Sequence, residues 1–190
     1  PASLPLVQCP AGTQSLLVNG SFEQPVISSS YVLLNQSSVP GWRTHAGDGM
    51  LELWRPAAGG LIPYDGSQNL EVQANSNAPV YQDIATTPGT TFTWSFAHRG
   101  RSGNDSLAVK IGDINALVVQ QTVTTGNSAW QHYTGTYTVP AGQTTTRFKF
   151  EPVSWAGGNS SMGNLVDAVL ICANPPAPTA TNTPVPPTAT

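Results

Sequence analysis

The stretch from Pro79 to Gly112 reads PVYQDIATTPGTTFTWSFAHRGRSGNDSLAVKIG, and its alternation of residue types decides the fold class. Within it, the aromatic residues Phe92, Trp94 and Phe96 alternate with threonine and serine. Side chains on a strand point to opposite faces with a period of two, so the three aromatics share one face. A face of that kind has to be buried, and the pattern therefore predicts a core strand.

The residues on either side of this strand repeat the alternation. Val80, Gln82 and Ile84 begin one alternation, in which two of the three side chains are apolar, and apolar side chains occupy every second position in Leu107–Ile111. The sequence Thr87–Thr90, with Pro followed by Gly, indicates a tight turn, and His98–Ser106 is a polar loop that carries two arginines. The pattern predicts a three-strand antiparallel meander with an arginine-bearing loop at one end.

Similar short segments recur along most of the chain, separated by turn residues, and none has a convincing helical pattern. Trp42, Trp94 and Trp130 are expected in the core. The other predicted strands are Leu16–Val18 with Phe22, Tyr31–Leu34, Met50–Trp54, Asn69–Ala74, Ala116–Val123, Tyr133–Val139, Arg147–Val153 and Leu165–Cys172. About ten short strands with regularly spaced turns predict an all-β, two-sheet antiparallel sandwich.

The composition favours a protein that works outside the cell. Charged residues make up 9% of the chain, and threonine, serine, asparagine and glutamine supply the polarity instead. The net charge of −3 argues against nucleic acid or an anionic membrane as the partner. No apolar run approaches the ~20 residues of a membrane span, so no membrane insertion is expected. The sequence begins at Pro1 rather than Met, which we interpret as a mature form after removal of a secretion signal.

The two cysteines, Cys9 and Cys172, lie near opposite ends of the predicted domain. In an oxidising compartment they would form a disulfide that joins the first and last segments. The chain-entropy model gives about 5 kcal/mol for so long a loop. Two unrelated buried thiols are the alternative.

The composition changes at the end of the chain. Residues 173–190 contain only proline, threonine, alanine, asparagine and one valine, and such a segment cannot build a core. We therefore predict one domain over residues 1–172, with an N-terminal lead-in over 1–14, and a tail or linker whose threonines are candidate O-glycan acceptors. Four Asn-x-Ser sequons also occur, at Asn19, Asn35, Asn104 and Asn159, although such matches arise often by chance.

Several phrases make the chain similar to a known group of proteins. YQDIATTPGTTFTWSFAHRGRSGNDSLAVKIG resembles the middle of a galactose-binding-like β-jelly-roll domain, and LLVNGSFEQP, VPGWRT, LELWR, GSQNLEV and GNLVDAVLI follow the same order. The resemblance covers Ser15–Ile171 and is nearest to the choice-of-anchor C type of bacterial surface proteins and related plant cell-wall proteins. It implies a jelly-roll fold. It implies no single function, because that superfamily includes sugar binders, adhesion modules and domains without a known ligand.

The resemblance also implies a structural calcium ion. Related modules place calcium between the first-strand motif and the last strand, and Asn19, Glu23 and Asp167 match those positions. Calcium binds six to eight oxygens, from carboxylates and main-chain carbonyls. Asp167 is the one acidic residue of an apolar strand, where an unpaired buried carboxylate would be costly. Alternatively, Glu23 and Asp167 only accept main-chain N–H groups.

Groups suited to catalysis are sparse. The three histidines stand alone in the sequence, without the spacing of a zinc site. A glycosidase needs two carboxylates, but Glu52 and Glu71 lie within strand alternations, where a structural role is favoured. The sequence predicts that the protein is not an enzyme, with polysaccharide cleavage by two carboxylates as the less favoured alternative.

Glycan binding is better supported, because sugars bind aromatic platforms flanked by a few fixed polar groups. The arginine fork would suit paired hydroxyls or a uronate carboxylate. Each aromatic could instead pack in the core, and the arginine loop could be held by Asp105 and Asp113 as surface ion pairs. The candidate ligand-binding residues are Trp155, Tyr64, Trp54, Arg99, Arg101 and Asp105.

Two functional hypotheses from different classes follow. The first is a non-catalytic secreted or cell-surface module that binds a cell-wall or matrix glycan. The second is a structural subunit of an extracellular filament or surface array, which assembles by self-association of the tail 173–190. An ordered proline-rich tail would need a partner's surface, since fixing each residue costs about 1–2 kcal/mol.

Overall fold

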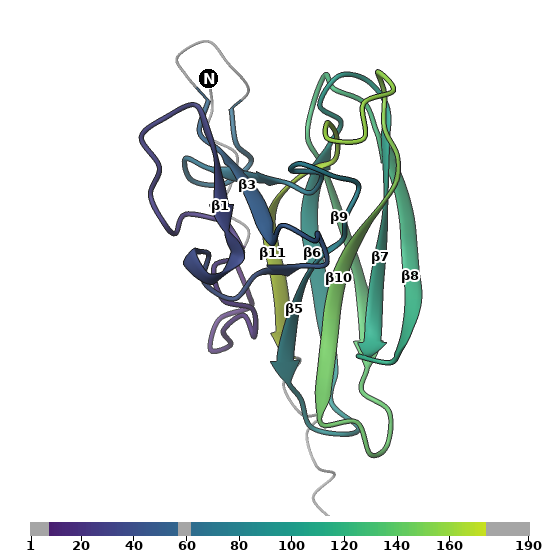
Figure 1. The fold of residues 1–190 in the computed structure, drawn as a ribbon. Coiled ribbons are helices and arrows are strands. Elements are labelled where there is room, and N and C mark those ends of the chain that lie inside the picture. The colour runs from purple at the N-terminus through teal and green to yellow at the C-terminus, as the bar shows by residue number, and fades with distance from the viewer. Residues whose placement is uncertain (1–7, 57–61, 174–190) are drawn as a thin grey trace, which may run out of the picture.

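A computed structural model describes residues 8–56 and 62–173, which form two antiparallel sheets packed face to face (Figure 1). Sheet A has the strand order β1-β3-β4-β11-β6-β9, and sheet B has the order β2-β5-β10-β7-β8. The strands are β1 (Tyr31–Asn35), β2 (Arg43–Thr44), β3 (Met50–Trp54), β4 (Asn69–Glu71), β5 (Val80–Ala85), β6 (Thr91–Arg99), β7 (Asp105–Asp113), β8 (Ala116–Thr125), β9 (Gln131–Thr138), β10 (Thr145–Ser154) and β11 (Leu165–Ala173). The only helix in the described ranges is the 3-10 turn η1 (Gln36–Ser38). The predicted all-β sandwich is confirmed.

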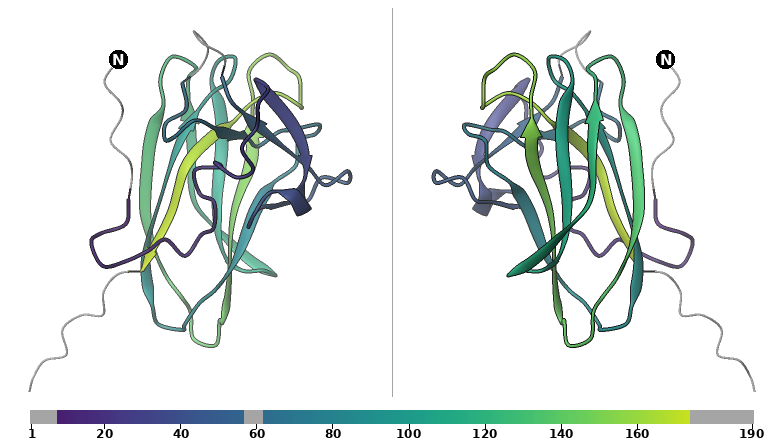
Figure 2. Two further views of the ribbon diagram at one scale, coloured as in Figure 1. Left: turned by 90° about the vertical axis from the view of Figure 1, so that its left-hand side faces the viewer. Right: turned by 90° about the vertical axis from the view of Figure 1, so that its right-hand side faces the viewer.

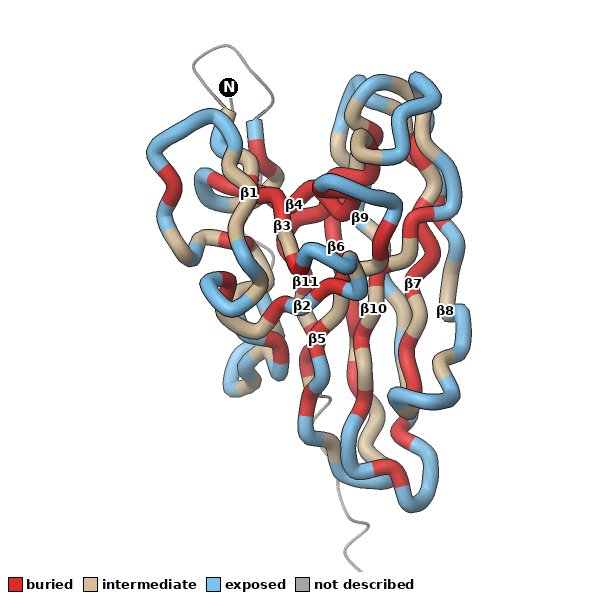
Figure 3. Tube along the Cα trace, in the orientation of Figure 1, coloured by how far each residue is buried: buried red, intermediate tan, exposed pale blue. Residues whose placement is uncertain are grey.

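The core lies between the sheets and is rich in aromatic rings. Phe96 on β6 contacts Phe150 on β10 edge to face, with ring centroids 5.0 Å apart, and Phe150 contacts Phe148 in the same way at 5.1 Å. The alternation of buried and accessible positions is visible along β5 and β10 in Figure 3. Trp42 and Trp94 are buried, as predicted. Aromatic residues at alternate positions of both sheets thus produce the two-layer core.

The predicted meander over Pro79–Gly112 is wrong. β5 and β7 belong to sheet B and both pair with β10, whereas β6 belongs to sheet A and pairs with β9 and β11. The turn between β5 and β6 is hydrogen-bonded to the end of β9, the edge strand of sheet A, because the Gly89 N–H donates to the carbonyl of Val139, the residue after β9. Consecutive strands that face each other across a core have the same apolar period as strands that lie side by side, so the pattern could not distinguish the two arrangements.

The predicted first strand, Leu16–Val18, is also wrong. The chain there meets β11 at one isolated bridge, Ser15 with Cys172. Positive φ angles at Asn19 (56°) and Phe22 (54°) turn the backbone away immediately. β4 is shorter than the predicted Asn69–Ala74 and ends at Glu71. By contrast, β3 has the predicted bounds.

The disulfide between Cys9 and Cys172 is present, and the predicted pairing is confirmed. It attaches the first described segment to the end of β11, and Figure 2 shows the purple N-terminal segment beside the yellow-green last strand. Apart from Ala173, the predicted tail 173–190 lies outside the described residues, as do residues 1–7 of the lead-in. No helix within the described ranges has the length and hydropathy needed to cross a membrane.

Candidate functional site

Polar and aromatic side chains gather on the outer face of sheet A, the face turned away from sheet B. Leu51 and Leu53 of β3 are buried in the core, so Glu52 and Trp54 point to the opposite side. Glu52 pairs with Glu71 in the register of β3 and β4, and Trp54 pairs with Asn69. Directly opposite residues of antiparallel strands have Cβ atoms about 5 Å apart, so these four side chains form one compact group.

Trp54 is the centre of what we call the Trp54 cluster (Tyr31, Trp54 and Arg101). Its indole stacks on the Tyr31 ring, with centroids 5.2 Å apart, and the Arg101 guanidinium carbon lies 4.6 Å from its centroid. Tyr31 is 52% exposed and therefore offers an aromatic ring to solvent. The cluster combines a stacking surface with a fixed cation, which suits sugar recognition.

Arg101 is held by a buried carboxylate. Its Nη1 lies 2.9 Å from both oxygens of Glu71, whose side chain is fully buried. Burial raises the pKa of Glu71 to about 7, although the Gly163 N–H and Arg101 stabilise its charged form. Burial, and then the neighbouring Glu71, raise the pKa of Glu52 to about 7 as well. Two adjacent carboxyls thus share one cation, and the pair holds protons near neutral pH.

Several buried polar atoms at this face lack partners. The Trp54 indole N–H and both side-chain amide atoms of Asn69 have no hydrogen bond within the described part of the chain, and the same holds for Arg99 Nε. The Trp54 N–H interacts favourably with Glu52 and Glu71 but forms a well-aligned hydrogen bond with neither. Unpaired buried polar groups cost free energy, so groups of this kind gather where a ligand or water completes them.

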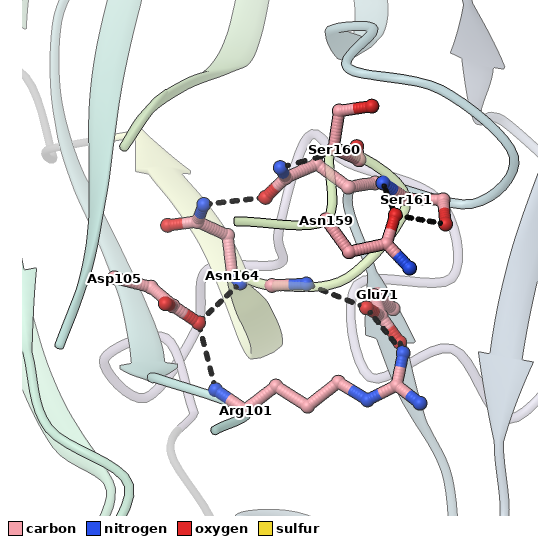
Figure 4. A network of polar contacts seen from close by, with 9 residues as sticks. Glu71, Arg101, Asp105, Asn159, Ser160, Ser161 and Asn164 are labelled. Carbon is pink, nitrogen blue, oxygen red and sulfur yellow. Dashed lines mark hydrogen bonds and ion pairs between the residues drawn. The ribbon is translucent and has the colours of Figure 1, made fainter. Parts of the chain in front are cut away.

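A hydrogen-bond network fixes the loops beside the cluster (Figure 4). Asp105 is buried, and its carboxylate accepts the main-chain N–H groups of Arg101, Ala156 and Asn164. Figure 4 shows Arg101 bonded to Asp105 at its main chain and to Glu71 at its guanidinium. The structure thus gives Asp105 a positioning role. Asp113 lies outside this network, and its carboxylate accepts the main-chain N–H of Asn115.

The network also positions Trp155. The half-buried Trp155 lies in the loop after β10, and a Cβ placed on Gly163 would be 2.8 Å from the Trp155 Cβ. Gly163 in turn donates to Glu71. Trp155 therefore lies beside Gly163, on a loop that Asp105 and Glu71 hold in place, and Glu71 joins this loop to Arg101 of the Trp54 cluster.

The buried His98 belongs to the same network. Its Nε2 lies 3.0 Å from Asn164 Oδ1 and its Nδ1 lies 2.9 Å from Thr125 Oγ1. The Asn164 amide nitrogen donates to Gln73, so its oxygen accepts the His98 Nε2–H. Burial lowers the pKa of His98 to about 4, so it stays neutral and structural.

Tyr64 lies in a second place, at the other edge of sheet A. It stacks on His132 with ring centroids 6.1 Å apart and meets Trp130 edge-on at 6.4 Å, forming the Tyr64 cluster (Tyr64, Trp130 and His132). The prediction that Trp130 belongs to the core is wrong, because it is half-exposed and donates to the Ile62 carbonyl. β3 and β9 are four strand positions apart, about 19 Å, so the structure separates Tyr64 from the predicted ligand-binding residues Trp54 and Arg101.

The predicted calcium ligands already have protein partners. Asn19 bonds the main chain of Gln24 through both amide atoms, and Glu23 Oε1 accepts the N–H groups of Ser67 and Gln68. Asp167 accepts the N–H groups of Asp65 and Ala168. Asn19 therefore closes a local turn, while Glu23 and Asp167 anchor the segment before β4.

Asp65, which the sequence reasoning missed, lies beside Asp167 and has a carboxylate oxygen without a hydrogen-bond partner among the described residues. Its Oδ2 accepts the Ser21 hydroxyl, but its buried Oδ1 has no partner among the described residues. Burial raises the pKa of Asp167 well above its usual value, and the charge of Asp65 adds to the shift. No group of three or more His, Cys, Asp or Glu side chains in the described ranges has metal-binding geometry. A cation here would rest on Asp65 and Asp167, with main-chain oxygens completing its shell.

The raised pKa values predict a pH dependence of stability. A carboxyl whose pKa rises from 4.5 unfolded to about 7 folded binds its proton more tightly in the folded state. The free energy of unfolding should therefore fall as the pH rises from about 5 to 7.5. In urea titrations, the decrease in the free energy of unfolding between pH 5 and 7.5 should be smaller for Glu52→Gln than for wild type, by at least about 1 kcal/mol. Asp48→Asn, at an exposed carboxylate with a lowered pKa, is the control; parallel curves for wild type and Glu52→Gln would refute the assignment.

The two antiparallel sheets and their order define a jelly-roll β-sandwich. The chain belongs to the DUF642 family, described as a protein of unknown function, whose model matches residues 15–172. No curated protein sequence matches the chain.

Solved structures with this fold include several carbohydrate-binding modules. TmCBM61, solved in complex with β-1,4-galactotriose, is 12% identical with a TM-score of 0.54, covering 85% of this chain and 99% of its own. The C-terminal family 22 carbohydrate binding module of Clostridium thermocellum Xyn10B is 16% identical with a TM-score of 0.52, covering 77% and 96%. The CBM22-2 xylan-binding domain of Paenibacillus barcinonensis Xyn10C is 14% identical with a TM-score of 0.51, covering 76% and 98%. At these identities the likeness concerns the fold.

Proposed function

We propose that this protein is a non-catalytic carbohydrate-binding module whose primary sugar contact is the Trp54 cluster. The observation that carries the proposal is an exposed aromatic ring beside a fixed cation, above buried polar atoms that lack partners. Trp155, on the loop that Glu71 joins to Arg101, supplies a further aromatic side chain. Tyr64 belongs to the second cluster, where a long glycan could make a further contact.

The charge balance of the cluster favours a neutral glycan. Two carboxyls, Glu52 and Glu71, lie around one guanidinium, so an incoming uronate would meet an excess of negative charge whenever both carboxyls ionise. Hydroxyl groups carry no such cost and can both donate and accept hydrogen bonds. Neutral β-linked glycans such as xylan and β-1,4-galactan are therefore the first ligands to test.

Binding is favoured over cleavage because of how the carboxyls are placed. Glu71 is fully buried, and its oxygens are engaged by Arg101 and Gly163. A glycosidase needs both carboxyls in contact with the scissile bond. Glu71 acts instead as the anchor of Arg101.

Isothermal titration with xylan and β-1,4-galactan oligosaccharides tests the proposal. Tyr31→Ala removes the exposed ring of the cluster and should weaken binding at least about fivefold. Trp155→Ala should weaken it in the same direction, whereas Val118→Ala, at an exposed position on sheet B, should bind like wild type. Absence of binding to both glycans, or wild-type affinity in both aromatic variants, would refute the site.

We further propose that a calcium ion stabilises the fold between Asp65 and Asp167, near the anchor provided by Glu23. The unpartnered Asp65 oxygen and the raised pKa of Asp167 support it. Saturating Ca²⁺ should raise the melting temperature by about 5–10 °C relative to EDTA. Asp65→Asn should abolish the difference and Asp113→Asn should keep it. Identical melting curves with Ca²⁺ and with EDTA would refute the ion.

The disulfide supports an extracellular setting, because such bonds persist in oxidising compartments. In this proposal residues 1–172 form the binding domain and residues 173–190 link it to a surface or to further sequence. Self-association through that tail stays a prediction.

A further inference from the structure

The outer face of sheet B gathers positive charge. Four of the seven cationic side chains of the chain lie on it, including both lysines, but only two of the ten carboxylates. The rest of the chain has three cations against eight carboxylates. We call this surface the lysine face; its charged members are Arg43, Asp83, Lys110, Arg147, Lys149 and Glu151.

The two lysines are placed directly opposite each other. Lys149 on β10 pairs with Lys110 on β7 in the sheet register, an arrangement that repels unless an anion lies between the two ammonium groups. Glu151 is that anion: its Oε1 lies 2.6 Å from Lys110 Nζ and its Oε2 lies 2.6 Å from Lys149 Nζ. Each ammonium has three donors, and one carboxylate engages only one from each. The pair can therefore bind further anionic oxygen atoms.

Arg147 extends the positive charge and covers the available aromatic ring. Its Nε and Nη2 bond Asp83 at 2.7 and 2.8 Å, while its guanidinium carbon lies 3.8 Å from the Tyr81 centroid. Burial, followed by the charges of Arg147 and Lys149, lowers the pKa of the nearby His45. Tyr81 is thus not free for sugar stacking, and the face presents charge rather than an open aromatic ring.

We propose that the lysine face binds a carboxylate-bearing polysaccharide of the polyuronate class, at a site separate from the Trp54 cluster. Arg43, Lys149 and Lys110 lie in one row across the sheet, which spans three strand spacings, or about 14 Å. A modest excess of cations along such a row suits a polymer with one charge per sugar. Double-stranded DNA, with a charge every ~1.7 Å, would need a denser cationic surface.

Titration with polygalacturonate at low salt tests the proposal, with two substitutions of opposite expected sign. Lys110→Gln should weaken binding about tenfold, because it removes a charge-assisted contact. Glu151→Gln should tighten binding about threefold, since it removes the competing carboxylate. Opposite signs cannot come from a general loss of folding.

Two controls separate this surface from the proposed sugar site. Tyr31→Ala should bind polygalacturonate like wild type. The affinity of the protein for the neutral polymer dextran should be the same in wild type, Lys110→Gln and Glu151→Gln. No binding of polygalacturonate, equal affinity of wild type and Lys110→Gln, or tighter binding of single-stranded DNA would overturn the proposal. Each of these results would leave the neutral-glycan titrations at the Trp54 cluster unaffected.

Discussion

Replacing Arg101 by methionine is expected to destabilise the domain by about 3–5 kcal/mol at pH 8. The substitution keeps most of the packing against Trp54 but leaves Glu71 buried without its cation. Because the pKa of Glu71 is already about 7, protonation can relieve part of this cost, and the loss should shrink as the pH falls to 5. Urea unfolding at both pH values measures the effect.

Arg55→Met is the matched control for Arg101→Met. Arg55 is exposed and donates to the Ile27 carbonyl, so its replacement should cost under about 1 kcal/mol at either pH. Adding Glu71→Gln to Arg101→Met should restore much of the lost stability at pH 8, because the uncompensated charge is gone. If Arg101→Met loses no more than Arg55→Met at pH 8, Glu71 does not depend on this ion pair.

Removal of the Cys9–Cys172 disulfide should have an effect of similar size. The bond closes a loop with a sequence separation of 163 residues, for which the chain-entropy model gives about 5 kcal/mol as an upper figure. The double variant Cys9→Ala, Cys172→Ala should therefore unfold at a clearly lower urea concentration. The Leu16 amide donates to the Ile171 carbonyl, and its hydrogen-exchange rate should be higher in the double variant than in wild type.

The disulfide also constrains the unfolded chain, so the urea slope needs to be compared. An increased slope in the double variant would show that part of the effect comes from a more expanded unfolded state. An unchanged midpoint, with Leu16 protected as in wild type, would contradict the view that this bond fastens the first segment to β11.

The sequence was most informative where neighbouring residues determine the structure. Met50–Trp54 alternates cleanly between apolar and outward-facing residues, and β3 has these bounds. The burial of Trp42 also followed from local sequence, because Pro40-Gly41 turns the chain inward before it. Choosing which strand pairs with which depends on distant segments, and this is why the meander prediction failed.

In the candidate site too, residue types could be interpreted from the local sequence, whereas contacts between distant residues could not. Trp54, Arg101 and Trp155 were identified from their residue types, but Glu71, the partner of Arg101, lies 30 residues away and carries no local signal. Tyr31 was assigned only to a strand, and its stacking on Trp54 depends on the β1–β3 register. A cross-strand comparison of outward positions on the predicted strands could have found it.

The central claim is that the Trp54 cluster binds a neutral glycan, and the five tryptophan indole N–H signals test it most directly. In ¹H–¹⁵N spectra, titration with xylan or β-1,4-galactan oligosaccharides should shift the signals of Trp54 and Trp155. Trp42, which donates to the Asn19 carbonyl in the core, should stay unchanged. Binding that shifts neither Trp54 nor Trp155 at saturation would contradict the claim.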